Sequence, residues 1–139
     1  MTYARHAAGQ RGIRSYAEIG LETEVLSATP ERLITLLFAG ARAALAQACV
    51  HIECHRVPER GNAIGKAIRI VDEGLRAGLD HQAGGELAHN LDRLYDYIIR
   101  ILLAANLEAD IDKLKQADAL LENIATAWQT SVDRQPSAV

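Results

Sequence analysis

The side chains best suited to metal chemistry form two short clusters, and the first is at Glu86 and His89. Their spacing matches the Glu-x-x-His pairs of di-metal carboxylate bundles, which need two such pairs and two further glutamates. The sequence has one pair. Both residues point away from the apolar stripe of Leu87, Leu91 and Leu94, so we expect them on a solvated helix face.

The second cluster puts His51 and His55 four residues apart, the spacing of a zinc-binding pair on a helix. Glu53 does not stand where the His-Glu-x-x-His metalloprotease motif needs it, and histidines also suit the negative end of a helix. Cys49 and Cys54 point to different faces of the same predicted helix, so we expect no disulfide. The sequence also has no nucleophile elbow, phosphate loop or dinucleotide glycine pattern. It therefore predicts no enzyme, no metal site and no cofactor.

Four amphipathic helices carry these side chains, because apolar residues recur at helical spacing through most of the chain. The expected ranges are 30–55, 58–80, 86–107 and 111–130. Thr29 is the expected N-cap of the first helix, with Pro30 at its first position, and Asp110 is the expected N-cap of the last. The predicted fold is all-α: an antiparallel up-down four-helix bundle with a short mobile N-terminal helical segment.

The helix at 86–107 is the most apolar of the four, and we interpret it as the central one. One stripe on it consists of Leu87, Leu91, Leu94, Ile98 and Ile101. A second set widens the apolar arc beyond what one seam needs, and it consists of Tyr95, Ile99, Leu102 and Leu103. A helix this apolar must be buried by several neighbours or present part of its surface to a partner.

Length and charge limit the possible functions. The 139 residues suffice for one domain, which we divide into an N-terminal arm (1–29), the bundle (30–130) and a disordered tail (131–139). Fifteen basic and eighteen acidic residues leave a formal charge of −3, so nothing favours nucleic acid or an anionic membrane. The apolar runs fall short of the roughly 18–20 residues of a membrane span, and we see no signal peptide. We expect a cytoplasmic protein, without direct membrane insertion, that is a monomer or a weak dimer.

Three apolar residues of the arm, Ile13, Tyr16 and Ile19, are three apart and form at most two weakly amphipathic turns. The arm is either a frayed tail or a detachable segment that covers an apolar groove until a ligand takes its place. The helix at 30–55 carries a second stripe on the side away from its core face. This stripe consists of Leu36, Ala43 and Val50, flanked by Ala39 and Ala46. It is either surface alanine chosen for helix propensity or a shallow groove for a partner's side chains.

The polar and aromatic residues of the central helix have separate expected roles. Tyr95 adjoins the core stripe, so we expect it to be buried. Tyr97 lies on the polar side with Asn90 and is suited to anchoring an interface. Asn106 falls inside the apolar arc, so its amide should form a hydrogen bond with a neighbouring helix end or a partner.

A series of short motifs connects the sequence to a known family. In chain order they are Tyr16 with Glu22-Thr23, Ala28-Thr29-Pro30-Glu31-Arg32-Leu33-Ile34, Leu37-Phe38-Ala39-Gly40-Ala41, Lys66-Ala67 and Leu75-Arg76-Ala77-Gly78-Leu79-Asp80. The most specific is Gly84-Gly85-Glu86-Leu87-Ala88-His89-Asn90-Leu91, followed by Leu94-Tyr95-Asp96-Tyr97, Ala105-Asn106-Leu107 and Ala127-Trp128. In this order and spacing, the chain resembles the bacterial flagellar secretion chaperones of the FliS type from Tyr16 to Trp128.

The resemblance implies a cytoplasmic export chaperone that binds the C-terminal helical segment of flagellin. Such a protein prevents premature polymerisation and supports delivery to the flagellar type III secretion apparatus, with a component of that apparatus as a second partner. The resemblance also associates the segment around Tyr16 with the ligand groove. Two alternatives remain: a self-associating helical bundle that acts as a structural interaction module, and a metal-carboxylate enzyme.

Overall fold

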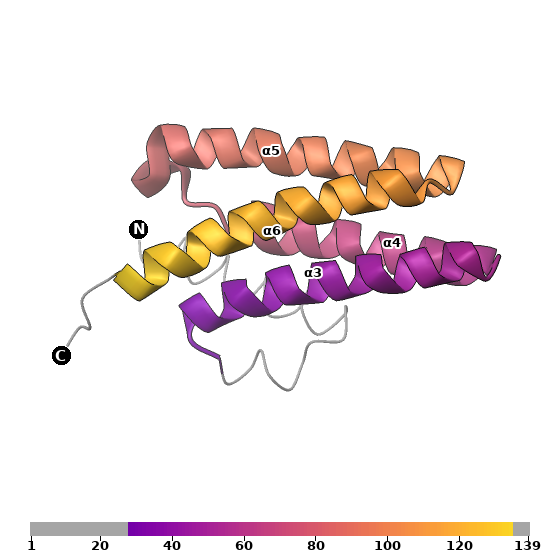
Figure 1. The fold of residues 1–139 in the computed structure, drawn as a ribbon. Helices are drawn as coiled ribbons and strands as arrows, with labels where there is room; N and C mark the ends of the chain where they lie inside the picture. Colours follow the sequence, from indigo (N-terminus) through magenta and orange to yellow (C-terminus); the bar gives the residue numbers. More distant parts are fainter. Residues whose placement is uncertain (1–27, 135–139) are drawn as a thin grey trace.

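The computed structural model describes residues 28–134, and every regular element within them is helical (Figure 1). The elements are α3 (Pro30–Glu53), α4 (Val57–Arg69), the π-helix η1 (Ile70–Arg76), α5 (His81–Glu108) and α6 (Ile111–Arg134). Because η1 continues α4, residues 28–134 form four rods, and successive rods run in opposite directions (Figure 1). Each rod contacts its two neighbours around the ring of α3, α4, α5 and α6. The predicted all-α four-helix bundle is confirmed, whereas the expected N-terminal helical segment lies outside the described residues.

Short polar side chains set the starts of three helices. Thr29 Oγ1 accepts a hydrogen bond from the backbone N–H of Arg32 at 3.1 Å, as expected for the N-cap of α3. Asp110 Oδ1 accepts hydrogen bonds from the first turn of α6 at 2.9 and 3.3 Å, which confirms the second predicted cap. Asp80 caps α5 in the same way, at 3.1 and 3.0 Å, and the sequence analysis missed this cap.

The cap at Asp80 corrects the predicted start of the central helix. The stretch 81–85 was expected to be a loop, but the chain is already helical from His81. The helix then kinks at Gly85, whose φ of 52° and ψ of −122° lie in a region that only glycine adopts readily. The predicted range, 86–107, therefore begins where the regular part of the helix resumes after the kink.

Two further helix predictions need correction. The segment 58–80 was expected to be a single helix, but it changes at Ile70 into the π-helix η1 and ends at Arg76. The sequence pattern missed this change because the π-helix buries the same apolar residues that an α-helix would present. The last helix was expected to end at 130, with a disordered tail from 131, yet α6 continues to Arg134.

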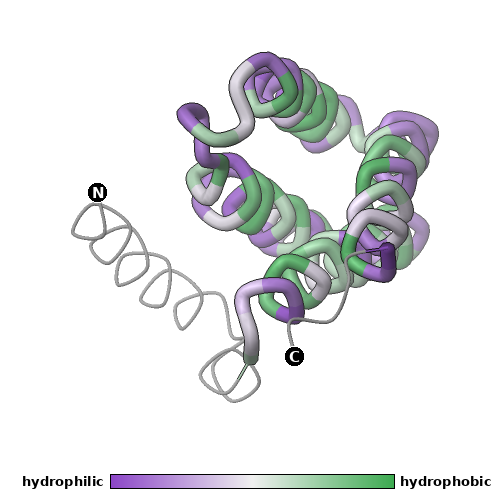
Figure 2. The backbone as a smooth tube through the Cα atoms, turned by 90° about the vertical axis from the view of Figure 1, so that its left-hand side faces the viewer, coloured by the Kyte–Doolittle hydropathy of each residue, from purple (hydrophilic) through white to green (hydrophobic). Residues whose placement is uncertain are grey.

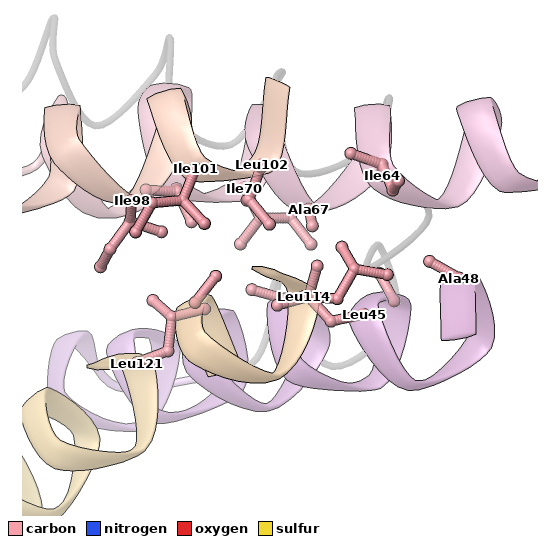
Figure 3. Packing of buried hydrophobic residues seen from close by; sticks show 14 of the residues in the cluster. Leu45, Ala48, Ile64, Ala67, Ile70, Ile98, Ile101, Leu102, Leu114 and Leu121 are labelled. Atoms are coloured by element: carbon pink, nitrogen blue, oxygen red, sulfur yellow. The ribbon is translucent and has the colours of Figure 1, made fainter. Parts of the chain in front are cut away.

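The core is entirely apolar over the described residues. In the end-on view of Figure 2, hydrophobic colouring concentrates where the helices face one another. The labelled side chains of Figure 3 point from the two sides of the bundle toward a common centre. The largest fully buried residues come from all four rods, and they are Leu37, Leu45, Ile64, Ile70, Val71, Ile98, Leu102, Leu114 and Leu121.

One residue of the predicted central stripe is not in the core. Leu87 is 67% exposed, and the first buried residue of α5 is Ala88. Helical spacing fixes the direction in which Leu87 points, but burial also requires a neighbouring element opposite it. Leu87 lies just after the kink, near the start of α5, and belongs to the part of this apolar helix that is left exposed.

The apolar content of α3 was also underestimated. By length and composition alone, α3 could cross a membrane, because it contains a strongly apolar 18-residue window with at most two charged residues. In the bundle, however, α3 contacts α4, η1 and α6 and buries six residues: Leu37, Phe38, Ala41, Ala44, Leu45 and Ala48. This is how the core helix of a globular bundle packs.

Candidate partner-binding surfaces

The second stripe of α3 faces away from the core. Ala43 is exposed, Val50 is 51% exposed and Leu36 is partly buried. The stripe is thus open to a partner, but most of its residues are alanines, which contribute little apolar area each. The choice between surface alanine and a shallow groove stays open.

Tyr95 lies in the core, only 4% exposed. Burial removes water from the phenol and raises the pKa of Tyr95 to about 12, because the charged phenolate is disfavoured there. The predicted burial is confirmed. In this conformation Tyr95 supports α5 from inside and does not reach a partner.

Asn90 and Tyr97 are seven residues apart on α5, or about two turns, and therefore lie on the same side of the helix. Both are exposed. The side-chain amide of Gln116, on α6, donates a hydrogen bond to the Tyr97 hydroxyl at 3.5 Å. These two residues therefore border α6, and the ring of Tyr97 is accessible to a partner.

Asn106 is on the opposite flank of α5. Its side-chain oxygen accepts a hydrogen bond from Arg60 Nε, in the first turns of α4, at 3.3 Å. The expectation that Asn106 bonds a neighbouring helix end is confirmed. The bond ties the start of α4 to the end of α5.

An apolar surface that the sequence analysis did not select lies beside this bond. On α4, Val57 is 57% exposed, three residues before Arg60. On α5, Leu103 is 55% exposed, three residues before Asn106, and Leu107 is 87% exposed. We call this surface the α4–α5 seam and define it by Val57, Gly61, Gly65, Leu103 and Leu107. The signals in the sequence were the wide apolar arc of α5 and two glycines four residues apart inside a helical pattern.

Two arginine clusters hold pairs of helices together. Arg76 Nε donates to Asp92 Oδ1 at 2.8 Å, and Arg76 Nη1 lies 3.5 Å from Asp96 and 3.6 Å from Asp72. This cluster joins η1 to α5. The hydrogen bond from Arg76 lowers the pKa of Asp92 and raises that of Arg76, because it stabilises both charged forms.

The second cluster joins α3 to α6. Arg42 donates from Nε and Nη2 to the two carboxylate oxygens of Asp118, at 2.8 and 3.2 Å. Glu122 adds a second carboxylate 3.5 Å from Arg42 Nη2. The hydrogen bond to Asp118 raises the pKa of Arg42. Two parallel bonds of this kind fix the relative position of the helices as well as their distance.

The residues first considered for chemistry are not gathered into a site. Glu86 and His89 are exposed. Both cysteines are free, and burial raises the pKa of Cys49, which lowers its thiolate fraction at neutral pH. Within residues 28–134, no group of three or more histidine, cysteine, aspartate or glutamate residues is arranged to hold a metal ion.

The predicted interaction residues are distributed around the bundle. The α3 stripe faces outward, Asn90 and Tyr97 border α6, and Asn106 borders α4. The predicted arm residues Ile13, Tyr16 and Ile19 lie outside the described residues. A partner that uses all of these surfaces has to wrap around the bundle.

Comparison with known proteins gives a consistent result. The family model described as "Flagellar protein FliS" matches residues 12–135. The "Flagellar secretion chaperone FliS" of Salmonella typhimurium is 49% identical over 118 residues, which cover 85% of this chain and 87% of the relative. The Escherichia coli protein of the same name is 40% identical over 122 residues, covering 88% and 90%. The "Flagellar secretion chaperone FliSB" of Pseudomonas aeruginosa is 44% identical over 118 residues, covering 85% and 93%.

Proposed function

The chain belongs to the FliS family of flagellar secretion chaperones, and from this premise we propose that it binds the C-terminal helical segment of flagellin until export. The protein is a cytoplasmic chaperone and not an enzyme. Binding prevents flagellin from polymerising too early, and the complex is then delivered to the flagellar type III secretion apparatus.

The observation that carries this proposal is a filled apolar core combined with large apolar side chains left on the surface. Among the described residues, the exposed large apolar ones are Val50, Val57, Leu87, Tyr97, Leu103 and Leu107. None of them is needed to close the core, which already contains side chains from all four rods. Exposed apolar surface of this kind is typical of sites that bind another protein.

A disordered amphipathic tail is a suitable ligand for such a surface. It folds into helices as it docks, and its apolar side is then hidden in the complex. Flagellin assembles into the filament through that apolar side, so the chaperone and the filament compete for it. Release requires no nucleotide hydrolysis, because transfer to the export apparatus shifts the binding equilibrium.

We propose the arm residues Ile13, Tyr16 and Ile19 as a detachable cover for this surface in the free protein. Their three-residue spacing gives one short apolar side, too short to form a stable helix alone. Such a segment binds weakly, so flagellin displaces it readily. The α3 stripe and the pair Asn90 and Tyr97 are proposed as further contacts with the ligand.

The experiment that tests the function is a calorimetric titration of the full chain with a peptide from the C-terminal segment of the cognate flagellin. We expect a one-to-one complex, a large negative heat capacity change and a gain in helical circular dichroism. Absence of binding would refute the proposal.

Sedimentation of the free chain over a range of concentrations tests the alternative of a structural bundle. We propose that the free protein is a monomer, since its core is complete without a second copy. A dimer that buries α5 and does not respond to flagellin would instead favour the self-associating module.

A further inference from the structure

Exposed apolar residues are concentrated at the α4–α5 seam. Three of the six exposed large apolar side chains of residues 28–134 belong to it: Val57, Leu103 and Leu107. By contrast, the α3 stripe contributes only Val50 to those six. A partner helix therefore gains more from burying apolar area at the seam than on the outward face of α3.

Both sides of the seam form continuous stripes. On α4, Val57, Gly61 and Gly65 follow one another at intervals of four, and the partly buried Ile68 comes three residues later. On α5, the partly buried Ile99 precedes Leu103 and Leu107 at the same interval of four. Residues at these spacings share one side of a helix. The Arg60–Asn106 hydrogen bond lies beside both stripes and joins the two helices at this point.

The two glycines of the seam have no structural cause within the described chain. A Cβ atom added at Gly61 or at Gly65 would meet no atom within 4 Å. Neither residue has a positive φ, so the backbone does not require glycine there. A glycine inside a helix costs roughly 1 kcal/mol relative to alanine. A side without Cβ atoms does, however, allow the backbone of another helix to approach closely.

The charge around the seam favours an acidic partner. Residues 56–69 contain four cationic side chains, Arg56, Arg60, Lys66 and Arg69, and a single anionic one, Glu59, although the whole chain has a formal charge of −3. Nearby carboxylates are already engaged, because Asp96 pairs with Arg76 and Arg100, and Glu73 pairs with Arg69. Arg69, four residues after Gly65, lies on the seam side of α4, whereas Lys66 points away from the stripe.

We propose that the α4–α5 seam is a docking site for an amphipathic helix within the flagellin segment. This helix has small residues where it crosses Gly61 and Gly65, larger apolar residues against Leu103 and Leu107, and acidic residues on its flank toward α4. The inference rests on the proposed function, flagellin binding, and specifies where the ligand docks and which chemistry is recognised.

The decisive variants are Gly61→Ala with Gly65→Ala, combined in one chain, because they separate stability from binding. Two alanines raise the helix propensity of α4 and meet no neighbouring atom, so the melting temperature should rise by a few degrees. If a ligand backbone approaches the glycines, the added methyl groups hold it away. We expect the Kd for the flagellin peptide to increase by at least about tenfold.

Two single variants test the other features. Leu103→Ser should weaken flagellin binding by a similar factor, whereas Ala119→Ser, at an exposed position of α6 outside every proposed contact, should leave it unchanged. Arg69→Glu should weaken binding at low salt, and raising the salt concentration should reduce the difference from the unmodified chain.

The failures of the two proposals are distinguishable. If the unmodified chain does not bind flagellin, the proposed function fails. If it binds and the double glycine variant binds equally well while melting at a higher temperature, the seam is not the docking site. Equal losses in Leu103→Ser and Ala119→Ser would also overturn the inference, because the effect would then not be specific to the seam.

Discussion

Adjacent leucines on α5 should respond to the same substitution in opposite ways. Leu102 is fully buried among the helices, whereas Leu103 is 55% exposed. Leu102→Ala leaves a cavity in the core, and we expect the free energy of unfolding to fall by about 2–5 kcal/mol. Leu103→Ala removes no core contact and lies on a helix surface, so its change in stability should stay within about 0.5 kcal/mol.

The expected effect on binding is reversed. Complete burial of a leucine side chain is worth about 1.5–3 kcal/mol, and about half of that remains to be gained at Leu103 when a partner covers it. Leu103→Ala should therefore weaken flagellin binding by about 0.8–1.5 kcal/mol, or roughly four- to tenfold in Kd. Leu102→Ala should bind with nearly unchanged affinity at temperatures where it is folded.

Urea unfolding followed by circular dichroism measures the first pair of effects, and calorimetric titration with the flagellin peptide measures the second. For each variant, the loss of stability is compared with the loss of flagellin affinity. The comparison is matched, because both variants remove the same atoms from neighbouring positions. Equal destabilisation by the two substitutions would refute the assignment of Leu102 to the core and of Leu103 to the surface. An affinity loss in Leu102→Ala as large as that in Leu103→Ala would show that the exposed surface is not the contact.

Four further predictions concern other parts of the molecule. Gly85→Ala should lower the free energy of unfolding by about 1–2 kcal/mol in thermal melts because its φ is 52°, whereas Gly65→Ala, the matched control in a regular helix, should raise it. Asp92 has a lowered pKa in the folded state, so its stabilising contribution is present above the pKa of the unfolded chain and is lost as the pH falls through the lower folded value. Asp92→Asn should therefore reduce the melting temperature at pH 7, and a difference from the unmodified chain that persists undiminished below pH 3 would contradict this. Tyr16→Ala should change flagellin affinity more than it changes stability, and a large drop in melting temperature at constant affinity would refute the detachable arm. Ala43→Asp should weaken flagellin binding at normal helix content, and full binding would remove the α3 stripe from the interface.

Features decided by neighbouring residues in the chain were predictable from the sequence. Thr29 and Asp110 cap their helices because the capping bond spans only two or three residues. The core stripes followed from helical spacing, and the hydrogen bond of Asn106 to α4 is one of the two alternatives that its position left open. Leu87 was mispredicted because burial depends on an opposing element that local spacing does not reveal.

The binding surfaces were less predictable, because they form where separate helices meet. Val57 and Leu107 are far apart in the sequence, and they become part of one surface only through the packing of α4 against α5. Only the packing of the helices shows that the space around Gly61 and Gly65 is open. The sequence also gave no sign of η1, since the same apolar residues are buried in either kind of helix.

Within residues 28–134 the buried residues are apolar apart from the Tyr95 hydroxyl, so the core is held together mainly by forces that have no direction. Such forces stabilise a compact helical bundle but discriminate poorly between alternative alignments of its helices. The alignment therefore depends on the bidentate contact of Arg42 with Asp118, 76 residues away, and on the contact of Arg76 with Asp92. These two surface clusters refine the alignment of the helices that they join, because the bidentate contact of Arg42 with Asp118 is made in one alignment only.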